Sequence, residues 1–203
     1  MGEISKFKEE FNKLMKLKGK VRGVVFQTDA EYVRNRGGEE GLSRLEEELK
    51  KIGYPIEYKD IKATSWYSLG MRVISLLVIK EIFNLNDKEI EEMGNAAPKY
   101  SFILRMLMKF FVTIQMSYKE SPKYWEKHYT IGELEAPGYD LKKRYFIIRL
   151  KDFKIDPVLC IYFGGYFKRI SQFLLKDAKN FKIEETKCMF KGDPYHEFLI
   201  TWE

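Results

Sequence analysis

The chain has 203 residues, of which 45% are hydrophobic and 33% are charged, and its formal net charge at pH 7 is +6. This composition excludes a disordered polymer, and the length allows one domain with a sizeable core. Charges of both signs are interspersed, and no recognition-helix pattern or aromatic-interleaved basic strand is present. We therefore do not expect nucleic acid as a partner.

The cysteine content and the apolar stretches bear on the compartment. Two cysteines, Cys160 and Cys188, are too few for a disulfide scaffold in a chain of this size. Residues 1–20 are charged every few positions, which is not typical of a secretory signal. The apolar stretches are too short to span a bilayer or contain basic residues. We expect a cytoplasmic protein with no membrane partner.

Apolar residues at helical spacing dominate the N-terminal half. The longest predicted helix begins at Pro98 and ends before Pro122, and the helix over 69–83 is polar only at Arg72, Lys80 and Glu81, which we expect to face water. Glycines at 37, 38 and 41 predict a loop that enters a helix rather than a phosphate cradle. Helices are predicted over residues 5–18, 42–52, 69–83, 87–93 and 98–118.

The pattern changes to strands after residue 128. Alternation over 129–134 and 145–150 predicts two strands joined by a turn at Pro137-Gly138. A helix begins at Asp156-Pro157, and strands are predicted over 181–190 and 196–202. The fold class is α+β, with a helical N-terminal half packed on a C-terminal antiparallel sheet of order strand-strand-helix-strand-strand. We expect a single domain over 1–203, with a mainly helical part (1–124) and a sheet-bearing part (125–203).

Common hydrolase chemistry has little support. The chain contains two histidines, His128 and His196, and no serine lies between nucleophile-elbow glycines. No His-Glu-x-x-His pair is present either. A reductase stays an alternative without a nicotinamide or flavin fingerprint. An enzyme is the less favoured hypothesis.

Four residues of the C-terminal part have metal-ligand chemistry. Glu185, Cys188 and His196 flank a turn at 192–194, and Cys160 lies in the first turn of the preceding helix. Residues late in one strand and early in the next come close across a tight hairpin. Thiolates, imidazole and carboxylate together suit zinc in a tetrahedral site. The alternative is that both cysteines fill core and that His196 is a hydrogen-bonded strand histidine.

The stretch from Glu185 to Phe198 resembles the terminal motif of the 4-vinyl reductase domain family, in which Glu-x-x-Cys is followed beyond a glycine turn by a second Cys. The resemblance covers residues 125–202. It implies several helices followed by an antiparallel sheet interrupted by a helix, a fold similar to that of transport-particle (TRAPP) subunits and haem nitric-oxide-binding domains.

The resemblance also implies a zinc site. In aromatic-responsive members, a helix cysteine, the Glu and the two motif cysteines hold the ion. Cys160, Glu185 and Cys188 match the first three places, and His196 stands where the last cysteine would be. Haem is not expected, because the related haem domains use a helix histidine and a Tyr-x-Ser-x-Arg run that is missing from this sequence.

The family further implies a pocket for a small apolar or aromatic molecule between the helices and the sheet. Aromatic and methionine side chains with a few polar tips are typical of such sites, although side chains of this kind more often simply fill core. The candidate ligand-binding residues are Phe102, Met106, Trp125, His128, Tyr129 and Tyr162.

The sequence thus favours a ligand-binding sensory or regulatory domain, with a small apolar or aromatic molecule and a separate signalling protein as partners. The alternative is a homodimeric scaffold resembling transport-particle subunits, with the apolar helices over 69–83 and 98–118 as the dimer surface. A haem-binding gas sensor is a lesser alternative.

Overall fold

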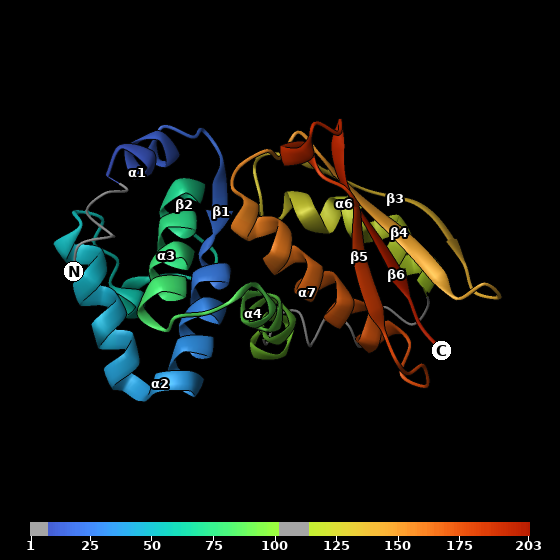
Figure 1. Ribbon diagram of the computed structural model, residues 1–203, viewed down its shortest axis with the longest axis horizontal. Coiled ribbons are helices and arrows are strands. Elements are labelled where there is room, and N and C mark those ends of the chain that lie inside the picture. Colours follow the sequence, from blue (N-terminus) through green and yellow to red (C-terminus); the bar gives the residue numbers. More distant parts are fainter. Residues whose placement is uncertain (1–7, 102–113) are drawn as a thin grey trace.

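A computed structural model describes residues 8–101 and 114–203 and confirms the α+β class. Figure 1 shows α1, α2 and α3 on one side of the molecule and a four-stranded sheet on the other, with α4 and α7 between them. The helices are α1 (Lys8–Met15), α2 (Gly23–Lys51), α3 (Leu69–Ile82), α4 (Asp87–Tyr100), α6 (Ile114–Glu126) and α7 (Pro157–Leu174). The strands are β1 (Lys20–Arg22), β2 (Trp66–Ser68), β3 (Glu133–Asp140), β4 (Tyr145–Lys151), β5 (Lys182–Lys187) and β6 (Tyr195–Thr201).

The helical part is built around α3. Ser68 caps this helix by accepting a hydrogen bond from the backbone N–H of Met71. Nine of its fourteen residues are buried, as expected for a helix that is apolar on most sides. β1 and β2 pair antiparallel beside it. Met71, Leu77 and Ile82 of α3 are only partly buried, and the dimer surface that the scaffold hypothesis placed on this helix stays a prediction.

α2 differs from the predicted loop followed by a helix. It extends from Gly23 to Lys51 with one non-helical residue, Gly38, at φ 68° and ψ −167°. Only glycine adopts such a backbone conformation without strain. The glycines therefore kink a long helix instead of opening a short one.

Two prolines that were predicted to begin and end a helix lie inside helices instead. The capping box of Asn86 and Glu89 begins α4 as its signature predicts, but the helix continues through Pro98 to Tyr100. Pro122 likewise lies inside α6 and does not end it. A proline removes only one hydrogen-bond donor, and a helix continues where packing compensates for it. The predicted helix over 98–118 falls largely outside the described residues.

The sheet has the spatial order β3-β4-β6-β5, with all neighbours antiparallel. Pro137 and Gly138 lie within β3 at an irregularity of the register, and the turn follows at 141–144. A proline is tolerated here because β3 is an edge strand. Phe146 and Leu150 of β4 and Phe198 and Ile200 of β6 are buried on one face of the sheet.

α7 connects the two sides of the molecule. It begins at Asp156, whose side chain accepts a hydrogen bond from the N–H of Val158, and it contacts α4 as well as β5 and β6. At the crossing of α4 and α7, a Cβ on Gly94 would meet the carbonyl oxygen of Tyr162, and a Cβ on Gly165 would meet that of Glu91. The two glycines thus allow α4 and α7 to cross in close contact, and this crossing determines where the side chains of α7 lie.

In the part of the chain that the structure describes, no helix is long and apolar enough to cross a membrane.

Candidate functional site

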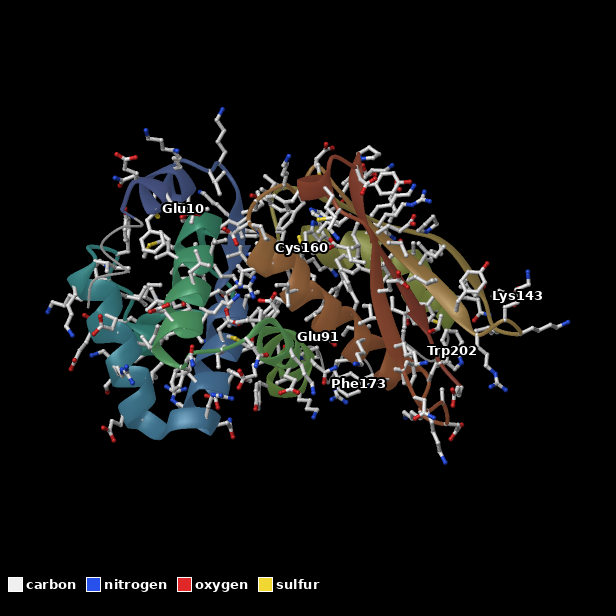
Figure 2. All side chains as sticks on the ribbon, in the orientation of Figure 1. Glu10, Glu91, Lys143, Cys160, Phe173 and Trp202 are labelled. Atoms are coloured by element: carbon white, nitrogen blue, oxygen red, sulfur yellow. The ribbon has the colours of Figure 1, made fainter. Side chains whose placement is uncertain are left out.

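The structure brings the four predicted metal ligands together at one end of α7. Their ligand atoms (Sγ of Cys160 and Cys188, a carboxylate oxygen of Glu185 and a ring nitrogen of His196) all lie within 4.8 Å of one another. Cys160 is in the first turn of α7, and Figure 2 labels it near the end of that helix beside the sheet. Three consecutive segments, α7, the end of β5 and the start of β6, therefore converge on one point.

An irregularity of β5 explains how Glu185 and Cys188 reach the same point. Residues three apart in a regular strand point to opposite faces of a sheet. Here the pairing of β5 with β6 shifts between Glu185 and Lys187, so that an extra residue lies on the β5 side. A bulge of this kind redirects the following side chains. As a result, Cys188 is buried on the same side as His196.

Hydrogen bonds fix this cluster. His196 Nδ1 lies 2.9 Å from Glu185 Oε1 and 3.6 Å from Cys160 Sγ. The backbone N–H of Cys188 donates to the carboxylate of Asp193 across the turn at 2.8 Å. Burial raises the pKa of the Cys160 thiol, and the nearby Glu185 and Cys188 raise it further. The thiol is therefore protonated when no cation is present.

One buried polar atom of the cluster is not hydrogen-bonded. Among the described residues, the buried Nε2 of His196 has no hydrogen-bond partner. Buried polar atoms seldom lack one. Two thiols, an imidazole and a carboxylate at this spacing can hold a divalent ion of borderline softness, and they can equally persist as a hydrogen-bonded group. Metal binding by the four residues remains a prediction.

A second site is a cavity of about 70 Å³ between α2, α4, α6 and α7. Its walls are mainly apolar and aromatic. The lining residues are Val24, Val25, Thr28, Ala97, Ser101, Tyr124, Trp125, His128, Tyr129, Leu134, Tyr162, Phe163, Tyr166 and Phe167.

The polar tips around this cavity have different partners. His128 Nδ1 is 2.9 Å from the carbonyl oxygen of Tyr124, which leaves Nε2 as the nitrogen for a ligand. Burial lowers the pKa of His128, so its imidazole is neutral at pH 7. Trp125 Nε1 donates to the carbonyl oxygens of Ile131 and Gly132, at 3.0 and 3.1 Å. The Trp125 ring is thus fixed as part of the cavity wall, whereas His128 Nε2 has no hydrogen bond to any residue that the structure describes.

Four of the six predicted ligand-binding residues line this cavity: Trp125, His128, Tyr129 and Tyr162. Phe102 and Met106 lie outside the described residues. The rings of Trp125 and Tyr129 stack with centroids 4.2 Å apart, which shows that they also serve as core.

A buried ion pair next to the cavity residue Tyr162 was not predicted from the sequence. Arg72 was expected to face water, but its side chain is 0% exposed and its Nε donates to Asp29 Oδ2 at 3.2 Å. Tyr162 Oη donates to the other carboxylate oxygen at 3.0 Å. The available signal was an arginine within an otherwise apolar helical run, since such a residue needs a partner when the helix is enclosed.

No family model matches the chain, and no curated protein matches it. Solved structures do share its fold. An H-NOX protein from S. oneidensis in the Fe(II)NO ligation state has 12% identity and a TM-score of 0.67, over 90% of this chain and 99% of that chain. An oxygen-binding H-NOX domain related to soluble guanylate cyclases has 14% identity and a TM-score of 0.61, over 90% and 95%. A mutant H-NOX protein from K. algicida has 10% identity and a TM-score of 0.60, over 90% and 96%.

These findings correct three expectations. The assignment to the 4-vinyl reductase domain family and its transport-particle relatives is wrong, because the similar structures are H-NOX proteins. Haem was not expected because the Tyr-x-Ser-x-Arg run is missing. This expectation is wrong, because solved structures that share this fold are described in an Fe(II) state and in an oxygen complex. The zinc assignment is withdrawn, since nothing in these comparisons supports it.

Proposed function

We propose that this chain is a sensory domain that binds a small, largely apolar molecule in the cavity around His128. The observation that carries the proposal is a cavity with apolar walls that is also lined by His128, whose Nε2 has no hydrogen bond to any described residue. Ligand pockets typically combine an apolar lining with a few placed polar groups. The H-NOX fold supports this function, because similar structures are described with small bound ligands.

The position of the cavity suits a sensor. α7 supplies Tyr162, Phe163, Tyr166 and Phe167 to its wall, and the same helix packs on β5 and β6. A ligand that binds one arrangement of these side chains better than another shifts the population of α7 positions. Ligand binding in the cavity would thereby change the position of the sheet, and a separate signalling protein could detect that change.

Haem has to be tested as an occupant, because proteins with this fold are described by Fe(II) ligation and by heme redox potential. His128 fits as a donor, since its Nε2 bonds to none of the described residues and its Nδ1 is oriented by a backbone carbonyl, as in many metal-binding histidines. The cavity volume does not fit, because about 70 Å³ is below the roughly 300–1,000 Å³ of ordinary ligand pockets. A porphyrin would require the walls to separate.

The experiment begins with native mass spectrometry and an absorption spectrum of untagged protein. A porphyrin band that disappears in His128→Ala would identify haem as the occupant. Xenon, detected by NMR, is the probe for the cavity itself, because it enters small apolar cavities. Saturable xenon binding that is lost in Ala97→Leu, which fills the cavity, but kept in Ala136→Leu on β3 supports the proposal. No retained molecule and no saturable xenon binding would overturn it.

A metal ion is the second part of the proposal. We propose that a divalent ion bound by Cys160, Glu185, Cys188 and His196 joins the first turn of α7 to β5 and β6. The supporting observation is the proximity of two thiols and an imidazole, which suits borderline-soft ions. Such an ion would fix one end of the helix whose middle lines the cavity.

Elemental analysis over the first-row divalent metals tests this part, with Co²⁺ as a spectroscopic probe of thiolate ligation. Glu185→Gln and Cys160→Ser should weaken Co²⁺ binding. Glu184→Gln, at the exposed neighbouring position of β5, is the matched control and should leave it unchanged. Equal Co²⁺ binding by Glu185→Gln, Cys160→Ser and the parent protein would show that the four residues are only core.

A further inference from the structure

The turn between β3 and β4 carries three consecutive cations at one end of the molecule. Lys142, Lys143 and Arg144 follow one another here, and all three are exposed. Figure 1 shows this turn remote from α1, α2 and α3, and Figure 2 labels Lys143 at its outer end. The carboxylate of Asp140 accepts hydrogen bonds from the backbone N–H groups of Lys142 and Lys143, at 2.8 and 2.9 Å. Aspartate fixes many turns in this way, so the cations stand on a turn of defined shape.

A second cationic segment lies beside this turn. The backbone N–H of Trp202 donates to the carbonyl oxygen of Arg144 at 3.3 Å, and Glu203 exchanges two backbone hydrogen bonds with Lys179, both at 2.9 Å. The connection over 175–182, between α7 and β5, is therefore held near the turn. It adds three exposed lysines to the three cations of the turn. We call these six residues the basic surface: Lys142, Lys143, Arg144, Lys176, Lys179 and Lys182.

Positive charge is concentrated at the basic surface. The segments that form it (139–144, 175–182 and 202–203) contain six cations and three carboxylates, so their net charge of +3 is half of the +6 of the whole chain. Among the residues that the structure describes, none of the six cations forms an ion pair. By contrast, Arg149, Lys151 and Lys168 each pair with a glutamate. Unpaired like charges that lie close together repel one another, and an anionic partner relieves that repulsion.

Exposed apolar side chains accompany these cations. Leu141, which directly precedes Lys142, is 44% exposed, and Tyr139 is 36% exposed. A leucine adds nothing to the binding of nucleic-acid phosphates, but it is buried favourably at the boundary between lipid headgroups and acyl chains. Tyrosine is also favoured at membrane interfaces. A convex turn offers a protein partner little of the roughly 800 Å² per side that a stable interface buries. The combination therefore favours an anionic lipid surface.

We propose that the basic surface docks the protein on an anionic bilayer, with Leu141 inserted among the headgroups and the cations against the lipid phosphates and carboxylates. The expectation of no membrane partner came from apolar stretches that cannot span a bilayer, and docking at the interface needs no such stretch. Neither Leu141 nor any cation of the basic surface lines the cavity around His128. This inference therefore stands or fails separately from the proposed cavity ligand.

Co-sedimentation of the full chain with lipid vesicles tests the proposal. The protein should bind vesicles of phosphatidylcholine and phosphatidylserine in a three-to-one ratio more tightly than vesicles of phosphatidylcholine alone. In about 1 M salt, where the Debye length is about 3 Å, this preference should disappear.

Two double variants locate the binding surface. Lys142→Gln/Lys143→Gln should weaken binding to the phosphatidylserine vesicles by about fivefold for each lysine removed. The matched control is Lys16→Gln/Lys18→Gln, which removes the same charge from exposed lysines beside α1, on the other side of the molecule. It should bind as the parent protein does. Equal losses in the two variants would show that only net charge matters and would overturn docking by the basic surface.

Leu141 separates insertion from surface attraction. Leu141→Ser keeps every charge and should weaken binding to the phosphatidylserine vesicles by about threefold to tenfold, because the buried apolar area is lost. Leu141→Met keeps an apolar side chain of similar size and should bind as the parent does. Unchanged binding of Leu141→Ser would overturn the insertion of this residue.

The remaining outcomes concern the class of partner. Equal binding of the parent protein to both kinds of vesicle would overturn the anionic bilayer as its partner. Tighter binding to a DNA duplex or to polyglutamate than to the phosphatidylserine vesicles, at the same salt concentration, would identify an anionic polymer instead and overturn the lipid proposal.

Discussion

The adjacent glycines Gly164 and Gly165 of α7 allow a direct test of the helix crossing that positions the cavity wall. A Cβ on Gly165 would meet the carbonyl oxygen of Glu91 and the backbone nitrogen of Asn95, whereas a Cβ on Gly164 would meet nothing within 4 Å. Alanine at 165 must therefore push α7 away from α4. Alanine at 164 has free space.

The magnitude follows from two effects. Replacing a helical glycine by alanine stabilises a helix by about 1 kcal/mol, and this gain is common to both variants. Overpacking against a neighbouring backbone costs about 1–3 kcal/mol, and only Gly165→Ala incurs it. The difference in the free energy of unfolding between the two variants therefore reports the clash alone. We expect Gly164→Ala to be the more stable by about 1–3 kcal/mol.

Urea denaturation and thermal melting of both variants provide the measurement. For a protein of this size, 1 kcal/mol corresponds to about 2–4 °C, so the two melting temperatures should differ by about 2–12 °C. Gly165→Ala should also weaken xenon binding, because the displaced α7 carries Tyr162 and Tyr166 away from the cavity. Equal stability of the two variants would refute the close crossing and the position of α7 derived from it.

Three further predictions concern the sites. Arg72→Met or Asp29→Asn alone should lower the free energy of unfolding by about 3–5 kcal/mol, whereas the double variant should lose less; additive losses in a double-mutant cycle would contradict the coupling of this buried pair. A chelator should lower the melting temperature of the parent protein but not that of Cys188→Ser, and metal at 100 times its Kd should restore about 2.7 kcal/mol. Burial lowers the pKa of His128 below 6.5, so the unfolded state binds its proton first and stability falls as pH drops below 6.5; His128→Gln should flatten this dependence by up to about 1.4 kcal/mol per pH unit, and identical pH profiles would contradict it.

The spacing of apolar residues along the chain predicted the existence of helices and strands better than it predicted the residues at which they begin and end. The apolar run from Leu69 and the cap at Asp156 mark the starts of α3 and α7 as the structure has them. Pro98 and Pro122 were read as helix boundaries, but both lie within helices. A proline in the sequence shows only that one backbone hydrogen-bond donor is missing. Whether the helix continues past it depends on the packing around it.

The cluster of Cys160, Glu185, Cys188 and His196 was found from residue type and spacing, because two neighbouring strands and the helix before them have few ways to pack. Its metal chemistry remains a prediction. The family resemblance built on the same residues was wrong, since one short motif does not determine which of several related folds the other residues adopt.

The sequence by itself determined the α+β class, the helical N-terminal half and the ligand-like cluster at the sheet, because these depend on periodicity and on contacts between neighbouring elements. Only the tertiary structure decided that Arg72 is buried against Asp29 and that residues of α2, α4, α6 and α7 line a common cavity. Such features arise where segments more than forty residues apart meet. Whether a polar side chain meets water or a partner there depends on what covers it, and local sequence does not record that.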